Sequence, residues 1–199
     1  CPEPFAVCLN DAPWELYGAS PEGGDYSGPG VMDNMFYPED AGVGTWEIFY
    51  DYTNEFGCSA QCSFLLTVNP LPWVEFDFSA TEVCLGEEIV LTATGPEDGA
   101  YPYQVDYLLG GVPATFEMPG PEVIFPFAIP FPGEYVVEGV GVTDANGCFA
   151  PLDVNVTIVV LPLTEITLQP VSVEVLYGGT AVFTVEADNA AGYQWFGPD

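Results

Sequence analysis

The 199-residue sequence predicts an all-β protein, built of tandem antiparallel β-sandwich domains that short Pro-rich linkers join. Residues 45–52 and 154–159 alternate in polarity with a period of two, as half-buried strands do. The 22 Gly and 20 Pro residues gather between such runs, which indicates many short strands separated by turns. Helical periodicity is almost absent.

Two motifs recur along the chain. The first is Val-Cys-Leu followed by a turn residue and an acid, at residues 7–11 and 83–87. A further copy at residues 175–179 has Leu176 at the cysteine position. The second motif ends in Gly-Cys and occupies residues 53–58 and 143–148. We interpret the chain as a series of homologous repeats.

The repeats divide the chain into two whole domains and the beginning of a third, at residues 1–70, 71–162 and 163–199. Both boundaries fall at a proline, which stiffens a linker and interrupts ladder hydrogen bonds. The third segment is too short to bury the apolar faces of a sandwich. We expect either that the chain continues or that a neighbouring subunit completes this domain by strand addition.

Six cysteines, an even number, favour an oxidising compartment and disulfide pairing. In each whole domain one cysteine lies on an early strand and one beside a late strand. If these strands face each other across the core, Cys8 pairs with Cys58 and Cys84 with Cys148. Cys1 and Cys62 flank the first bridge and are expected to form another.

The sequence leaves other arrangements of the cysteines open. Cys1–Cys58 with Cys8–Cys62 is an alternative pairing. A zinc site could use four cysteine ligands, and a mature N-terminal cysteine could carry a lipid anchor. We favour disulfides, because the chain contains no His and the remaining cysteines are distant in sequence.

The charge is extreme: 30 Asp and Glu residues stand against no Lys, Arg or His, so the formal net charge is −30. The explanations are adaptation to acidic, saline or protease-rich surroundings, cation binding over the whole surface, or a sequence in which basic residues are misassigned. Nucleic acid is excluded as an electrostatic partner, because nothing neutralises phosphates. No run of about 18 apolar residues is present, so we expect no membrane insertion.

Acidic pairs such as Glu87 and Glu88 could bind calcium at the surface, but no EF-hand loop is present. A solvated acidic face is the simpler interpretation, and we expect no dedicated cofactor. Without His and Lys, the usual general bases and nucleophile activators are missing. We therefore expect that the protein is not an enzyme.

Aromatic side chains mark the candidate interfaces. Trp46 and Tyr50 share one face of an alternating strand, whereas Phe49 lies on the other face, which suggests that a partner or glycan covers part of the sheet. The segment 121–132 includes Phe125 and Phe127 among several prolines, so it is expected at a sheet edge or an interface.

The opening at residues 1–8, the Gly-rich stretch 23–31 and the two Gly-Cys turns together resemble a known family. They are similar to the tandem immunoglobulin-like and PKD-like repeats of very large secreted surface proteins of Bacteroidetes-type bacteria. The resemblance covers nearly the whole chain. It implies a cell-surface adhesin, stalk or filament of stacked β-sandwiches.

We therefore expect a structural segment of an extracellular fibre or cell-surface stalk, which associates with itself or continues in a longer chain of repeats. The alternative is an adhesin module that binds carbohydrate or another surface through exposed aromatics. Both hypotheses place the protein outside the cell.

Overall fold

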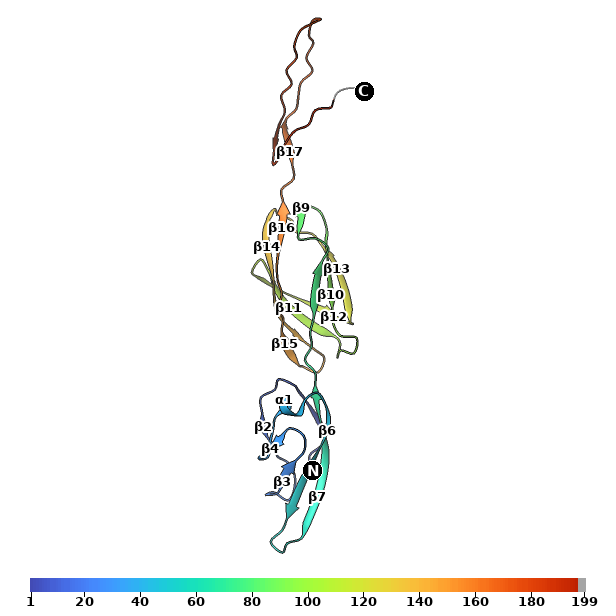
Figure 1. Ribbon diagram of the computed structural model, residues 1–199, viewed down its shortest axis with the longest axis vertical. Coiled ribbons are helices and arrows are strands. Elements are labelled where there is room, and N and C mark those ends of the chain that lie inside the picture. Colours follow the sequence, from blue (N-terminus) through green and yellow to red (C-terminus); the bar gives the residue numbers. More distant parts are fainter. Residues whose placement is uncertain (197–199) are drawn as a thin grey trace.

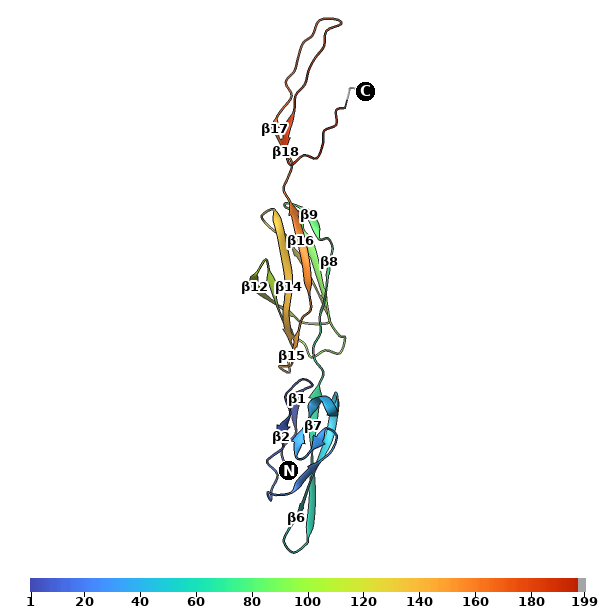
Figure 2. The same cartoon turned by 60° about the vertical axis from the view of Figure 1, so that its left-hand side comes forward.

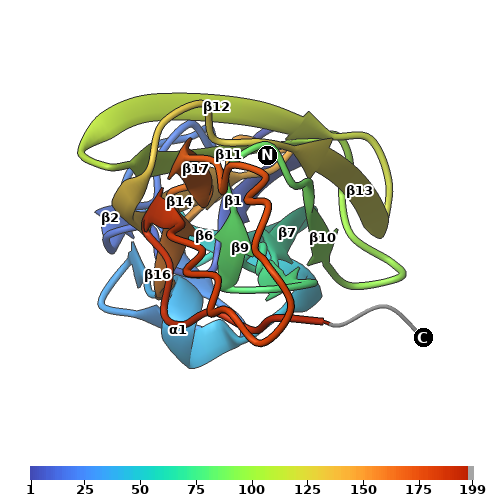
Figure 3. The same cartoon turned by 90° about the horizontal axis from the view of Figure 1, so that it is seen from above.

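The computed structural model describes residues 1–196. Figures 1 and 2 show a rod in which two β-sandwich domains lie end to end and the third segment extends from the far end. Seen along the long axis, the domains project onto one another (Figure 3). The expected all-β class is confirmed.

The first domain contains two small sheets and one helical turn. Its elements are β1 (Phe5–Cys8), β2 (Trp14–Glu15), β3 (Asp25–Ser27), β4 (Val31–Met32), β5 (Met35–Phe36), α1 (Pro38–Ala41), β6 (Gly44–Thr53) and β7 (Ser59–Asn69). One sheet has the order β1-β7-β6-β3 and the other β2-β5-β4. The long antiparallel hairpin β6–β7 spans the domain, and β1 runs parallel to the last part of β7.

The core of the first domain lies between these two sheets. Alternation along β6 and β7 sends Ile48 and Leu66 inward, where both are fully buried against Phe36 of β5. Burial of apolar surface of this kind supplies the main favourable term for folding. The hairpin thus carries the core on one face and mostly polar side chains, together with Phe49 and Leu65, on the other.

The second domain is a larger sandwich. Its strands are β8 (Glu75–Phe78), β9 (Glu82–Cys84), β10 (Ile89–Thr94), β11 (Tyr103–Leu109), β12 (Val112–Met118), β13 (Glu122–Phe127), β14 (Gly133–Thr143), β15 (Phe149–Pro151) and β16 (Asn155–Leu161). One sheet has the order β13-β10-β8, and the other β12-β11-β14-β16-β9 with β15 beside β14. As β1 does with β7, β9 runs parallel to the end of β16.

Two apolar clusters fill the second sandwich. Tyr103 and Met118 belong to the cluster at the end near the first domain, and Ile89 and Ile158 belong to the other. Asp144 is the buried charged residue of the described chain, and its carboxylate is hydrogen-bonded to backbone N–H groups. That arrangement satisfies a group that would otherwise be costly to bury.

The third segment contains β17 (Glu165–Leu168) and β18 (Glu186–Asp188), which pair antiparallel. Most of its apolar side chains are exposed, Leu176 and Tyr177 among them. Pro70 follows β7 and Pro162 follows β16, at the two expected boundaries. Within residues 1–196, no helix has the length and apolar character required to cross a membrane.

The buried phenol of Tyr103 leads us to predict a loss of stability at high pH. Burial, and next the neighbouring Tyr101, raises the pKa of Tyr103 to about 12. The stabilisation that comes from keeping this phenol neutral is fully present below pH 10, because the phenol is then neutral in both the folded and the unfolded chain. Between pH 10 and 12 only the unfolded phenol ionises, so the free energy of unfolding falls, on the order of 2 kcal/mol over this range.

We expect Tyr103→Phe to lose stability less steeply than the parent chain over this range. Chemical denaturation at successive pH values measures the difference, with Cys58 and Cys84 changed to Ser in both proteins to prevent thiol exchange. Parallel pH profiles for the two proteins would contradict the prediction.

Candidate functional site: the bridged junction between the first and second domains

A disulfide joins the first two domains. Cys8, the last residue of β1, is bonded to Cys148 in the hairpin between β14 and β15, and their Cα atoms are 5.4 Å apart. Strand β1, which ends at Cys8, lies in the upper part of the first domain (Figure 2), and the hairpin that leads into β15 lies at the lower end of the second (Figures 1 and 2). The bond therefore crosses the junction.

Local hydrogen bonds hold Cys8 in place. Its backbone N–H donates to the Asp11 carboxylate (2.8 Å), and its carbonyl accepts the Asp11 N–H (3.1 Å). The following Leu9 N–H donates to the Asn69 carbonyl at 3.0 Å, which continues the parallel pairing with β7. The cysteine thus has a fixed position beside the start of the linker.

Cys148 is positioned by a second set of bonds. The Asp144 Oδ1 atom accepts the N–H groups of Asn146 (2.9 Å) and Cys148 (2.8 Å). The Asp144 N–H donates to the Cys148 carbonyl at 3.0 Å, and Gly147 has a φ of 83°, which suits glycine. Cys148 is fully buried.

The linker and a side chain contribute further contacts to the junction. The Asn10 amide donates from Nδ2 to the Phe149 carbonyl (3.0 Å), a hydrogen bond between the two domains. Pro72 and Val74 are buried, and Leu71 packs on the lower core of the second domain. The linker is therefore anchored on the second domain at Leu71, Pro72 and Val74, whereas Pro70 and Trp73 are exposed.

The expected pairs Cys8–Cys58 and Cys84–Cys148 are wrong in this structure. In the strand ladder, Cys8 lies opposite Asn69, the last residue of β7, whereas Cys58 directly precedes the first residue of β7. The 11 residues of β7 separate the two positions by about 35 Å, far beyond the reach of a disulfide. Cys84 and Cys148 lie at opposite ends of the second domain in the same way. Cys58 and Cys84 are exposed free thiols.

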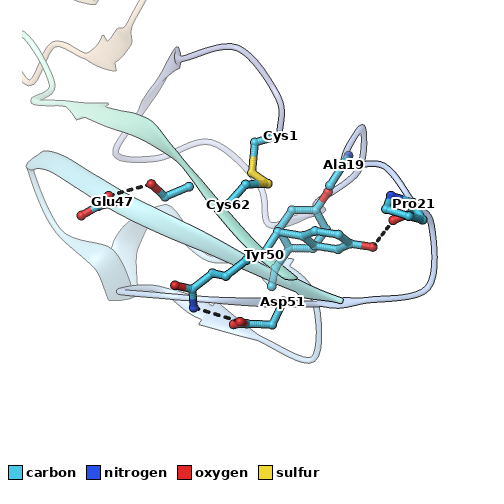
Figure 4. Close-up of a disulfide and its surroundings, with 10 residues drawn as sticks. Cys1, Ala19, Pro21, Glu47, Tyr50, Asp51 and Cys62 are labelled. Carbon is cyan, nitrogen blue, oxygen red and sulfur yellow. Dashed lines mark hydrogen bonds between the residues drawn. A yellow bond between two sulfur atoms is a disulfide. The ribbon is translucent and has the colours of Figure 1, made fainter. Parts of the chain in front are cut away.

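The structure contains the expected pair Cys1–Cys62, with Cα atoms 5.9 Å apart. Figure 4 shows this bond tying the start of the chain to β7. Nearby, Gln61 donates to Asp51 (2.9 Å) and Ser63 donates to Glu47 (2.7 Å), so polar pairs line the outer side of the β6–β7 hairpin.

Of the two expected interface aromatics of the first domain, Tyr50 is buried and Trp46 is only partly exposed. Tyr50 is buried and donates its hydroxyl to the Pro21 carbonyl at 2.6 Å (Figure 4). It packs against Tyr26, with ring centroids 4.7 Å apart. Trp46 is half-buried, and its Nε1 donates to the Gly42 carbonyl at 2.9 Å. The alternating pattern predicted their shared face, but the domain's own loops and second sheet cover that face.

Phe125 and Phe127 lie at an apolar cleft in the second domain. They belong to β13, an edge strand, as the prolines of this segment predict. The cleft has a volume of about 600 Å³ and opens between the edges of the two sheets, where β12 and β13 face each other. None of its described lining residues is charged. It could accept apolar groups.

Among residues 1–196, no group of three or more Asp, Glu or Cys side chains is arranged to hold a metal ion. Diffuse binding of cations by the carboxylates stays a prediction.

No protein-family model and no curated protein matches the chain. Among solved structures, it is similar to an I-band fragment of titin, at 14% identity over 85% of this chain and 66% of that one, with a TM-score of 0.45. It is also similar to fibronectin(III)-like modules of Clostridium thermocellum CbhA (19% identity, 62% of this chain, 65% of that one, TM-score 0.37). A third similar structure holds the four N-terminal Ig domains of a Dscam1 isoform (11% identity, 80% of this chain, 43% of that one, TM-score 0.33).

The chain thus spans about two thirds of the first two structures and less than half of the third. These likenesses concern the fold alone. The chain's own sheets make it a tandem array of immunoglobulin-like β-sandwich domains.

The cysteine arrangement predicts the thiol chemistry of the native chain. We expect an alkylating reagent to modify Cys58 and Cys84 without prior reduction, because both are exposed, and to modify the other four cysteines only after reduction. Peptide mapping after cleavage beside acidic residues reads the pairs, since the chain has no trypsin site. A bridged Cys8–Cys58 or Cys84–Cys148 peptide would contradict the assignment.

Proposed function

We propose that the chain is a segment of an extracellular stalk or fibre, in which immunoglobulin-like domains are held end to end as a stiff rod. The junction disulfide, Cys8–Cys148, carries this proposal. It gives the two domains a second covalent connection besides the linker. A protein whose task is to hold a distance or to bear load gains from such a connection.

The geometry of the junction explains how bending would be resisted. A single linker leaves two domains free to swing, which is the usual behaviour of domains with a small shared interface. Here the linker packs on the second domain and the disulfide connects the two domains a second time, so bending must strain both connections at once. The Asn10–Phe149 hydrogen bond opposes rotation about them.

The location outside a cell is supported by the disulfides, because such bonds persist in oxidising compartments. The recurring Val-Cys-Leu and Gly-Cys motifs support the narrower assignment to the tandem immunoglobulin-like and PKD-like repeats of Bacteroidetes-type surface proteins. A structural role also needs no catalytic group, in keeping with a chain that has no His, Lys or Arg.

An adhesin module is the second candidate, and the apolar cleft beside Phe125 and Phe127 is the observation that favours it. The cleft suits apolar side chains better than sugars, since sugar binding requires several directed hydrogen-bonding groups. Carbohydrate binding through Trp46 loses its basis, because that ring is partly covered and its N–H is hydrogen-bonded within the domain.

The stalk proposal predicts the effect of removing the junction disulfide. We expect the Cys8→Ser, Cys148→Ser variant to keep both domains folded and to bend at the junction. Small-angle X-ray scattering should then show a shorter mean end-to-end length and a broader distribution of lengths.

The matched control is Cys1→Ser, Cys62→Ser, which removes a bond within the first domain. It should lower the stability of that domain by about 4 kcal/mol and leave the rod shape unchanged. A junction variant with the scattering profile of the parent chain would contradict the proposed role.

Assembly of such rods side by side should depend on cations. The formal charge of −30 has no compensating basic residue, so parallel rods repel each other at low ionic strength. We expect separate rods in low salt with a chelator, and lateral association when calcium is added, followed by light scattering. Sodium chloride at matched ionic strength separates screening from divalent bridging. Lateral association that is the same with and without either salt would contradict this account.

A further inference from the structure

Cys8 and Cys84 occupy equivalent places in their domains. The Cys84 N–H donates to the Glu87 carboxylate (2.7 Å), as the Cys8 N–H does to Asp11. The Leu85 N–H donates to the Leu161 carbonyl (2.9 Å), which repeats the bond between Leu9 and Asn69. Each cysteine ends a short strand that runs parallel to the last residues of its domain.

Cys58 and Cys148 are equivalent as well. The Asn54 Oδ1 atom accepts the N–H groups of Phe56 (3.0 Å) and Cys58 (2.9 Å), in the pattern that Asp144 shows toward Asn146 and Cys148. The Asn54 N–H donates to the Cys58 carbonyl at 3.0 Å. Both hairpins therefore present their cysteine at the lower end of a domain.

One member of each equivalent pair forms the junction disulfide, and the other is free. Where a neighbouring domain is present, the hairpin cysteine Cys148 is fully buried; where the described chain places none, Cys58 is exposed. Cys84 is exposed and ends β9, which lies at the upper end of the second domain, where the third segment begins (Figures 1 and 2). The two thiols thus stand in the positions that form an inter-domain bond elsewhere in the same molecule.

The linker to the third repeat preserves the spacing. In the strand ladders, Cys8 lies opposite Asn69, and Cys84 lies opposite Leu161. The number of residues from Asn69 to Val83 equals the number from Leu161 to Val175. Each linker carries a proline directly after the paired residue. A third repeat would therefore reach the upper end of the second domain as the second reaches the first.

We propose that Cys84 and Cys58 each form a further inter-domain disulfide of the junction type. In each case the partner cysteine belongs to another repeat of this kind. Cys84 would bind the Gly-Cys hairpin of the third repeat, in a part of that repeat outside the 199 residues, since residues 163–199 contain no cysteine. Cys58 would bind the strand-end cysteine of another repeat. Leu176 replaces that cysteine in the third repeat, so this series of bonds cannot continue past it. The inference rests on the stalk function proposed above.

The bond forms by thiol–disulfide exchange. The two thiols lose two protons and two electrons, and a disulfide of the oxidising compartment, of the glutathione or oxidoreductase type, is reduced to two thiols. Docking of the neighbouring repeat would bring the two sulfur atoms together, and the compartment supplies the oxidant.

The direct test maps the disulfides of the protein that carries the whole third repeat, without reduction. The Cys84 peptide should be joined to a hairpin peptide of that repeat that ends in Gly-Cys. A free Cys84 thiol in the oxidised protein, or Cys84 joined to a cysteine outside the Gly-Cys hairpin of the third repeat, would overturn the inference.

A second test replaces residues 163–199 with another copy of residues 71–162 in which Cys84 is changed to Ser, so that every labelled Cys84 peptide comes from the first copy. The protein is oxidised with glutathione disulfide. The second domain has its own sheets and core, so the added copy carries its fold with it. We expect labelling of the first-copy Cys84 by an alkylating reagent to fall to background. Because the copies otherwise share their sequence, Cys148→Ser in the second copy alone is the control: it should restore labelling of that Cys84 and leave Cys8–Cys148 intact.

The outcomes separate the two proposals. If Cys8–Cys148 forms while Cys84 stays fully reactive in the duplicated chain, this inference fails and the stalk function stands. If neither bond forms, both fail. Loss of labelling that persists in the control variant would mean that Cys84 pairs elsewhere, and it would also overturn the inference.

Discussion

The covalent bond between Cys8 and Cys148 determines how the first two domains act on one another. It depends on two local structures: a strand end whose cysteine N–H is held by a carboxylate, and a hairpin whose cysteine N–H is held by Asp144. Each structure is complete within its own domain, so the two sulfur atoms are placed before they meet. The docked linker then brings one domain onto the other at a defined orientation.

The same local structures show which groups the carboxylates bind in a chain without Lys, Arg or His. No side-chain salt bridge between acid and base can form, because Lys, Arg and His are absent. Several carboxylates instead accept backbone N–H groups at turns, as Asp11, Glu87 and Asp144 do. Such charge-assisted bonds are stronger than neutral ones. Apolar burial, the strand ladders and two disulfides provide the remaining stabilisation, while the unpaired acids keep the surface strongly solvated.

Much of the fold could be predicted from the sequence, because strand alternation and turn residues act locally. The period-two pattern in residues 45–52 corresponds to β6, and the Gly-Cys motif at residues 143–148 corresponds to the hairpin after β14. The disulfide partners could not be derived, because the parallel pairing of β1 with the end of β7 is a tertiary contact that places Cys8 and Cys58 at opposite ends. Alternation likewise assigned Tyr50 to a face without revealing that Tyr26 and Pro21 cover it. The repeated motifs held the missing signal: equivalent cysteines at opposite ends of successive domains can meet at a junction.

The two free thiols provide the measurement that tests the rod most directly, because they lie at opposite ends of the two-domain unit. Dyes attached to Cys58 and Cys84 report that length by single-molecule fluorescence energy transfer. A rod with a closed junction predicts a single narrow population of low transfer efficiency, which broadens toward higher efficiency when Cys8 and Cys148 are both changed to Ser. A broad distribution in the parent chain, indistinguishable from that of the variant, would contradict the claim that the disulfide fixes the junction.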